Sequence, residues 1–157
     1  ILFFESNFNS MKIIFALAFL LNSCSNQYYN KNIEMNYKNY TTIKNLKWKN
    51  RLLVLVNVND SSTINNIKKY TKQFIERDVI IITIESKSSY IDKIKMKKQF
   101  DNSLFKKIDP KSENTLFLIG KDGNIKEIYS SSINFDLIIQ KIDSMPMRKR
   151  EMDNQGL

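Results

Sequence analysis

The stretch Arg51-Leu-Leu-Val-Leu-Val-Asn-Val58 decides the fold class of this chain. It is a run of leucine and valine with almost no polar interruption, and such runs are typical of strands that are covered on both faces of an α/β sheet. The next residues, Asn59-Asp60-Ser61-Ser62, offer side-chain oxygens for a turn and a helix N-cap. The sequence therefore predicts a central buried strand that leads directly into a helix.

A helix and a second buried strand are predicted next. Over residues 63–77, apolar or small side chains recur at helical spacing with lysines between them. The residues expected to face the core are Ile64, Ile67, Thr71 and Phe74. Residues 79–84 then read as a strand of β-branched residues. Two strands separated by a helix predict a parallel pair with a right-handed crossover.

The second half of the chain is expected to contain a hairpin and a final helix. Residues 86–108 hint at helix through Ile91, Ile94, Met96 and Phe100, and Pro110 closes this segment. Residues 115–119 and 124–129 predict two strands, because the Asp-Gly pair of Gly120-Lys-Asp-Gly123 between apolar runs is a strong hairpin signal. The last element, residues 134–143, places Phe135, Ile138, Ile139 and Ile142 on one helical face.

The predicted fold class is α/β, with a central mixed sheet of about four to five strands and flanking helices. The order of elements resembles the thioredoxin-like fold, a three-layer sandwich. Another small α/β sandwich is the alternative that the pattern leaves open.

Residues 11–24 of the N-terminal region predict an export signal. Lys12 precedes nine unbroken apolar residues, Ile13 to Leu21, and this run is too short to span a bilayer. The ending Leu21-Asn22-Ser23-Cys24 resembles the lipobox of bacterial lipoproteins, in which the cysteine is acylated and becomes the first mature residue. An ordinary signal peptide is the alternative. The resemblance implies lipid attachment at Cys24 and a membrane partner, and Ser25, which is not acidic, resembles the pattern of sorting to the outer membrane.

The expected organisation follows from these segments. Residues 25–45 are polar and show no sustained period, which predicts a tether between membrane and domain. Docking of its tyrosines on the domain is the alternative. The predicted divisions are an over-extended start (1–10), a signal peptide (11–23), a flexible tether (24–45), a folded domain (46–147) and a basic C-terminal tail (148–157).

Composition excludes several kinds of chemistry. The chain has 157 residues, one cysteine and no histidine. It therefore offers no internal disulfide, no Cys-His or Ser-His-Asp catalyst and no two-cysteine redox pair, and we expect no metal or cofactor. The net charge of +9 is unchanged when residues 1–23, with one lysine and one glutamate, are removed. Because the basic residues are spread along the chain without interleaved aromatic clusters, we do not expect a nucleic-acid partner.

Four segments carry a resemblance to a known family. They are Leu46-Lys-Trp-Lys-Asn-Arg-Leu-Leu-Val-Leu55, Phe74-Ile-Glu-Arg-Asp-Val-Ile80, Leu118-Ile-Gly-Lys-Asp-Gly123 and Ile142-Asp-Ser-Met-Pro-Met-Arg-Lys-Arg-Glu-Met152. Together they resemble domain-of-unknown-function family 4174 (DUF4174) over about residues 46–155. The resemblance implies a thioredoxin-like fold and a location outside the cytoplasm, and it implies no established reaction.

The C-terminal segment has two readings. Pro146 is expected to stop the preceding helix. The triplet Arg148, Lys149 and Arg150 then offers a possible partner-binding site for an anionic group. The plainer interpretation, which we favour from sequence, is a solvated tail with local ion pairs.

The thioredoxin-like resemblance raises the question of redox activity. Enzymes of that fold place a reactive cysteine after the first core strand, where the helix N-terminus lowers the thiol pKa. Here that place reads Asn57-Val-Asn-Asp-Ser-Ser-Thr63, and Asn114 stands where redox members commonly have a cis-proline. We therefore predict no catalytic residues for thiol–disulfide exchange.

The functional expectation is an exported, lipid-anchored protein of the bacterial cell envelope that acts as a binding or structural module. Its partner would be an unknown envelope protein or glycan. The alternative is an envelope enzyme that uses non-thiol chemistry, or an oxidoreductase-related protein.

Overall fold

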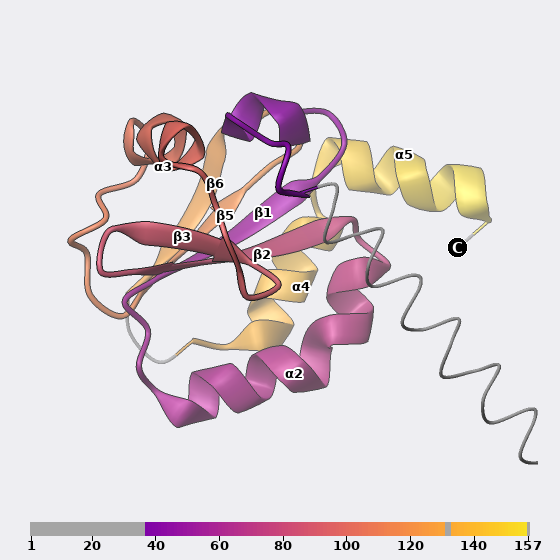
Figure 1. Cartoon of the computed structure of the whole chain (residues 1–157). Coiled ribbons are helices and arrows are strands. Elements are labelled where there is room, and N and C mark those ends of the chain that lie inside the picture. Colours follow the sequence, from indigo (N-terminus) through magenta and orange to yellow (C-terminus); the bar gives the residue numbers. More distant parts are fainter. Residues whose placement is uncertain (1–36, 131–132, 157) are drawn as a thin grey trace, which may run out of the picture. The chain divides into compact units, whose positions relative to one another are not determined.

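The computed structural model describes residues 37–130 and 133–156. The chain divides into two units, residues 1–39 and 40–157. The second unit contains η1 (Ile43–Leu46), β1 (Arg51–Val56), α2 (Ser61–Ile75), β2 (Val79–Glu85), β3 (Ser88–Ile91), β4 (Ile94–Lys95), α3 (Lys98–Phe105), β5 (Thr115–Ile119), β6 (Ile125–Tyr129), α4 (Phe135–Asp143) and α5 (Pro146–Gln155) (Figure 1).

The sheet has six strands in the order β4-β3-β2-β1-β5-β6. Strand β1 pairs in parallel with β2, so that Arg51 lies opposite Val79. On its other side β1 pairs antiparallel with β5, and β5 continues into the antiparallel strand β6. The order β2-β1-β5-β6, with β5 running opposite to its neighbours, is the thioredoxin-like arrangement, which confirms the predicted fold class. The short strands β3 and β4 make the sheet larger than expected.

Helices cover both faces of the sheet and complete three layers (Figure 1). Because side chains alternate along a strand, β1 contributes to both cores. Leu53 and Leu55 face α2 and α4, where they join one core cluster. Most other residues of this cluster come from α2, α4 and β5: Tyr70, Phe74, Leu116, Leu118, Phe135, Ile138, Ile139 and Ile142. The intervening residues of β1 (Leu52, Val54, Val56) are also buried. By the same alternation they point to the opposite face of the sheet, which η1 and α3 cover (Figure 1).

The helix starts are set by side chains that the sequence supplies at the right places. The Asp60 carboxylate caps α2 by accepting from the backbone N–H groups of Ser62 and Thr63. Asn134 caps α4 in the same way. Pro146 lies at the first turn of α5, where its missing N–H costs no hydrogen bond. The predicted stop after α4 is confirmed, but the proline also starts a further helix.

Residues 86–97 differ from the prediction, because they form two tight hairpins and an extended segment instead of a helix. Glu85 pairs with Ser88 and Ile91 with Ile94, which leaves two-residue turns between the strands. The turn residues Ser86, Lys87, Asp92 and Lys93 all have positive φ angles, between 48° and 67°. Such turns usually contain glycine or asparagine, and their absence concealed the hairpins. Helix α3 accounts only for residues 98–105.

The buried face of α2 also differs in part from the prediction. Phe74 is buried and Ile67 is partly buried against the core, as expected. Ile64 is 43% exposed and Thr71 is exposed, whereas Thr63 and Tyr70 take the core positions. The Tyr70 ring stacks on Phe135 with 5.5 Å between centroids, and its hydroxyl donates to Asp136 at 2.6 Å. This hydrogen bond allows a polar side chain to occupy the α2–α4 contact.

Both ends of the predicted domain differ in structure from the sequence expectation. The segment expected as the end of a flexible tether contains the 3-10 helix η1, which buries Ile43 and Leu46. The segment expected as a solvated basic tail belongs to helix α5, and Arg148 within it is only 4% exposed. This charged side chain can be buried because two acidic partners lie beside it, Asp143 of α4 and Glu151 of α5 itself.

Candidate functional site

The carboxyl end of β1 is the position that redox enzymes of this fold use, and here it is occupied by a helix cap. The Asp60 carboxylate accepts hydrogen bonds from the Ser62 hydroxyl at 2.6 Å and from the Thr63 hydroxyl at 2.7 Å. These two side-chain bonds, together with the backbone N–H groups of the same residues, hold the pKa of Asp60 far below its usual range. A carboxylate with so low a pKa is a weak base.

A cavity of about 340 Å³ lies at this end of the sheet. Its lining consists of Val58, Asp60, Ser62, Thr63, Asn114, Ser130 and Ile133. The Asn57 side chain beside it donates to the backbone oxygens of Pro110 and Ser112 at 3.1 and 2.9 Å, and so ties the loop after α3 to the end of β1. In the described part of the chain, these residues supply caps and loop contacts, and the lining contains no thiol, imidazole or lysine amine.

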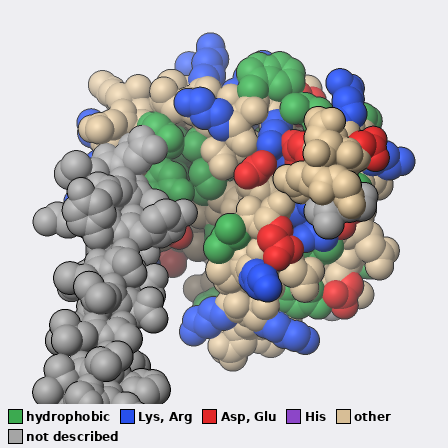
Figure 2. Space-filling model, turned by 90° about the vertical axis from the view of Figure 1, so that its right-hand side faces the viewer, with side chains coloured by type: hydrophobic (Ala, Val, Ile, Leu, Met, Phe, Trp, Pro, Cys, Tyr) green, Lys and Arg blue, Asp and Glu red, His purple; other side chains and the backbone are tan. Residues whose placement is uncertain are grey.

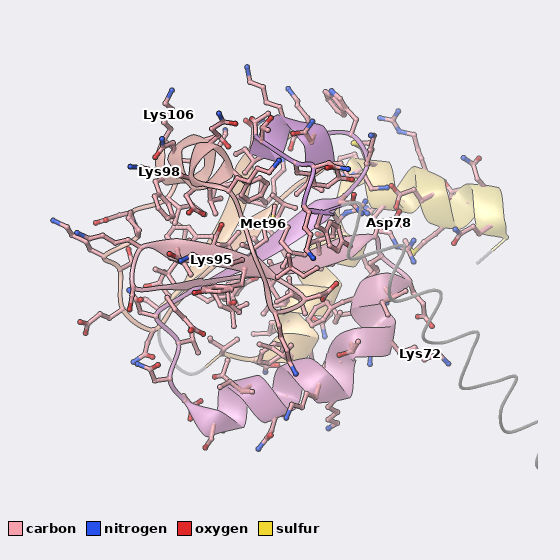
Figure 3. All side chains as sticks on the ribbon, viewed as in Figure 1. Lys72, Asp78, Lys95, Met96, Lys98 and Lys106 are labelled. Atoms are coloured by element: carbon pink, nitrogen blue, oxygen red, sulfur yellow. The ribbon has the colours of Figure 1, made fainter. Side chains whose placement is uncertain are left out.

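The opposite end of the sheet carries a network of ion pairs. We call it the ion-pair network; its members are Arg51, Arg77, Asp78, Lys121, Asp143, Arg148 and Glu151. Figure 3 labels Asp78 at this end of the domain. At the centre of the network the Arg51 guanidinium, 1% exposed, donates two parallel hydrogen bonds to the Glu151 carboxylate at 3.0 and 3.2 Å. Bidentate pairs of this kind combine charge with fixed geometry.

Three further cations, Lys121, Arg77 and Arg148, complete the network around the Arg51–Glu151 pair. The Lys121 ammonium, 9% exposed, contacts Glu151 at 2.7 Å and Asp78 at 2.8 Å. The Arg77 guanidinium holds Asp143 with bonds of 2.9 and 2.8 Å. Arg148 links both parts, because its side chain lies 3.4 Å from Asp143 and 3.7 Å from Glu151. The network therefore joins β1, β5–β6, the start of β2, α4 and α5.

The acids of the network are held in their charged form. Burial raises the pKa of Glu151, but hydrogen bonds from Arg51 and Lys121 outweigh it and lower the pKa below its ordinary value. Burial likewise opposes the charged form of Asp143, and hydrogen bonds and charges of Arg77 and Arg148 lower its pKa overall. Cations are thus matched by carboxylates that stay ionised at neutral pH.

The sheet register explains why residues distant in sequence meet here. Arg51 begins β1, and the parallel partner β2 begins at the neighbouring residue Val79, directly after Arg77 and Asp78. Strand β5 runs antiparallel to β1, so the C-terminal end of β5, followed by Lys121, lies at the same end of the sheet as Arg51. Helix α4 then ends at this edge and α5 starts there. Asp143 at the end of α4 therefore lies beside Arg77, and Glu151 of α5 lies beside Arg51 and Lys121. Arg148 of α5 lies near both acids.

A second cavity, of about 370 Å³, adjoins the ion-pair network. One part of its lining comes from β1, the β5–β6 turn and β6, namely Arg51, Gly120, Lys121, Asp122 and Lys126. The other part comes from α4, the α4–α5 connection and the start of α5, namely Lys141, Ser144, Met145, Pro146 and Met147. This cavity combines four cationic side chains with an apolar wall, which makes it the candidate binding site.

The predicted site residues fall in different places. Cys24 lies outside the described residues. The triplet Arg148, Lys149 and Arg150 does not form one surface, since Arg148 is buried in the network and the other two are exposed. Partner binding by Arg148, Lys149 and Arg150 stays a prediction. Sequence reasoning missed Arg51, Lys121 and Glu151; a charged residue at the first position of an otherwise apolar strand was the available signal for Arg51.

Two other features concern the described residues as a whole. Within residues 37–130 and 133–156, no group of three or more acidic, cysteine or histidine side chains has an arrangement that would hold a metal ion. In the same ranges, none of the helices has the length and hydrophobicity needed to cross a bilayer.

Comparison with solved structures finds distant likenesses. The mitochondrial 2-Cys peroxiredoxin of Plasmodium falciparum is 14% identical, with 72% of this chain and 83% of that chain covered and a TM-score of 0.45. The reduced 2-Cys peroxiredoxin of Plasmodium vivax is 15% identical, with 73% and 72% covered and a TM-score of 0.48. AhpC of Mycobacterium tuberculosis is 13% identical, with 61% and 69% covered and a TM-score of 0.42.

Comparison with curated proteins finds no match. Comparison with protein families finds one, which extends from the cap of η1 to Glu151 in α5 and so includes the sheet, the ion-pair network and the adjoining cavity. Residues 42–151 match the family described as a domain of unknown function (DUF4174), and the chain belongs to this family.

Proposed function

We propose that this protein is an exported, lipid-anchored component of the bacterial cell envelope, in which a redox-inactive thioredoxin-like domain acts as a binding or structural module. Its partners would be the membrane, through acylated Cys24, and an envelope protein or glycan. The outer membrane is the more favoured location, because Ser25 follows the cysteine.

The observation that carries the proposal is the content of the carboxyl end of β1. Thiol chemistry in this fold needs a cysteine at the start of the helix that follows this strand. Asp60, Ser62 and Thr63 occupy that start and bond to one another as a cap. The sequence has one cysteine, Cys24, which precedes the domain. If that thiol is acylated, the mature protein has no free thiol.

Binding is supported by the other end of the sheet. The ion-pair network fixes five elements around the cavity that Met145 and Lys121 help to line. A cavity with preorganised charges and an apolar wall is suited to holding a ligand. The described residues around it contribute no nucleophile activated by a neighbouring base, so we favour binding over turnover.

The anchor is tested by the mass of the N-terminus after expression in a bacterial host. We expect the membrane fraction to contain a chain that begins at Cys24 and carries acyl groups. The matched variant Cys24→Ser should yield no acylated species and should leave the membrane fraction. A wild-type chain that keeps residues 11–23, or begins at Cys24 without acyl groups, would refute the anchor.

A further inference from the structure

We propose that the cavity beside the ion-pair network binds a small organic anion with an apolar body, such as a medium-chain carboxylate. This inference rests on the proposal that the domain is a binding module and names the ligand class for it. The volume of about 370 Å³ lies in the range of small-molecule sites. A ligand of this class would place its acid group toward the lysines and its apolar part against the methionines.

The apolar wall is built by the end of the α4–α5 connection and the first residues of α5. Met145, Pro146 and Met147 line the cavity in succession, and Met145 is only 9% exposed. Methionine side chains are flexible and polarizable, so they adapt to ligands of different shape. This wall therefore provides contact area for a hydrocarbon or aromatic group without specifying one shape.

The charged walls favour an anion. The lining contains the cations Arg51, Lys121, Lys126 and Lys141 and one acidic residue, Asp122. Lys126 pairs with Asp122 at 2.7 Å, and Lys141 pairs with Glu127 at 2.9 Å. Both lysines are partly exposed, at 32% and 42%, and exposed ion pairs are weak. Their ammonium groups are therefore free to exchange these partners for a ligand carboxylate.

One of the residues that line the cavity, Arg51, has a donor without an acceptor. The Arg51 side chain is 1% exposed and lines the cavity, yet its Nε has no hydrogen-bond partner. Among the described side chains it is the one buried nitrogen or oxygen left unpartnered. Buried donors are normally satisfied, so an unpartnered one calls for an acceptor. An anion seated against Arg51 and Lys121 would bring an oxygen to this region.

The distribution of charge on the surface favours a cavity that binds a small anion over an extended surface that binds a polyanion. Figure 2 faces the side of the molecule on which α5 lies in Figure 1, and it shows acidic and basic side chains interspersed on that face. A continuous basic surface would favour a large polyanion. Cations gathered in a cavity with an apolar wall favour a small anion instead.

The test is a titration of the whole chain, labelled with ¹³C at the methionine methyl groups, with sodium octanoate. We expect saturable shifts of the Met145 and Met147 methyl signals. The double variant Lys126→Gln/Lys141→Gln should weaken the affinity about tenfold, because two partly exposed ion pairs with the ligand carboxylate are lost. The matched control Lys72→Gln/Lys95→Gln removes the same charge at exposed sites on α2 and β4 (Figure 3) and should retain wild-type affinity.

Three results would overturn the inference. The first is the absence of saturable shifts at Met145 and Met147. The second is equal affinity for 1-octanol, which would show that the acid group is not recognised. The third is an equal loss of affinity in the control variant, which would show an effect of net charge alone. Acylation of Cys24 is measured separately, so failure here leaves the proposed anchor standing.

Discussion

The two ends of the central sheet use polar residues in different ways. At the carboxyl end of β1, Asp60 is bonded to residues two and three positions further along the chain. At the opposite end, Arg51 is bonded to Glu151, one hundred positions away. The first set is a local helix cap, whereas the second joins five elements of the fold. The comparison indicates that Asp60, at the end used for chemistry in redox enzymes of this fold, makes the short-range contacts of a helix cap.

The difference between the two ends also indicates where charged groups are positioned to bind a ligand. A cap uses its polar atoms internally, and the Asp60 oxygens already accept from both Ser62 and Thr63. The ion-pair network holds its charges in place around a cavity and leaves Arg51 Nε without a partner. Rigidly held charges are a better basis for recognition than a satisfied cap.

The largest effect is expected when Glu151 is replaced by glutamine. The change leaves the Arg51 guanidinium buried without its charged partner, and breaking a buried pair in this way costs about 3–5 kcal/mol of unfolding free energy. Urea unfolding followed by circular dichroism measures it. The control Asp153→Asn alters an exposed acid of the same helix and should stay within about 0.5 kcal/mol of wild type. Equal losses in both variants would contradict the special role of Glu151.

The ion-pair network should make the unfolding free energy depend on pH in acid, whereas a contact between uncharged side chains would not. The pKa values of Asp143 and Glu151 are lowered in the folded protein, so the unfolded state binds protons first as the pH falls. Their contribution is complete above the unfolded pKa values of about 4 and is lost as the pH drops toward the folded values. Urea midpoints should thus be level near neutral pH and fall below about pH 4.

The urea midpoints of Glu151→Gln over the same pH range are the control for the loss of stability in acid. With one titrating acid removed from the network, the decline in acid should be shallower than in wild type. Identical acid profiles for wild type and variant would show that groups elsewhere cause the decline.

The carboxyl end of β1 should resist conversion into a thiol site. In a Cys24→Ser background, Ser62→Cys places a thiol beside the Asp60 carboxylate, whose negative charge raises the thiol pKa. Adding Asp60→Asn removes that charge and leaves the helix N-terminus to favour the thiolate. We expect alkylation by iodoacetamide at pH 7 to become several-fold faster. An unchanged rate would show that Asp60 does not control the electrostatics of this end.

The smallest effect is expected from Asp60→Ala. The change removes the cap of α2 but leaves its packing through Phe74 and Tyr70 in place. The urea midpoint should fall by clearly less than in Glu151→Gln. A loss as large as that of the network variant would overturn the distinction between a local and a global role.

Much of the fold was predictable because local signals agree with it. The apolar run from Arg51 onward predicted a buried strand, and Asp122-Gly123 predicted the β5–β6 hairpin. The strands β3 and β4 were missed because their turns place Ser86-Lys87 and Asp92-Lys93 at positive φ, where glycine or asparagine is the usual signal. Here cross-strand pairing outweighed the unfavourable turn conformation.

The candidate site was less predictable because it depends on register. Arg148 was singled out in the sequence, but its burial follows from Asp143 and Glu151 on both sides of it in space. Lys121 reads as part of an exposed turn until the antiparallel pairing of β5 places it beside Asp78. The sequence shows these charges, but the partners of each are set only by the assembled sheet.

The proposed redox inactivity of the domain is tested most directly by an insulin-reduction assay with dithiothreitol. The whole chain with unmodified Cys24 is compared with the Cys24→Ser variant at equal concentration. We expect both proteins to give the uncatalysed rate, because no thiol stands at the start of α2. A wild-type rate above this level that Cys24→Ser abolishes would contradict the account.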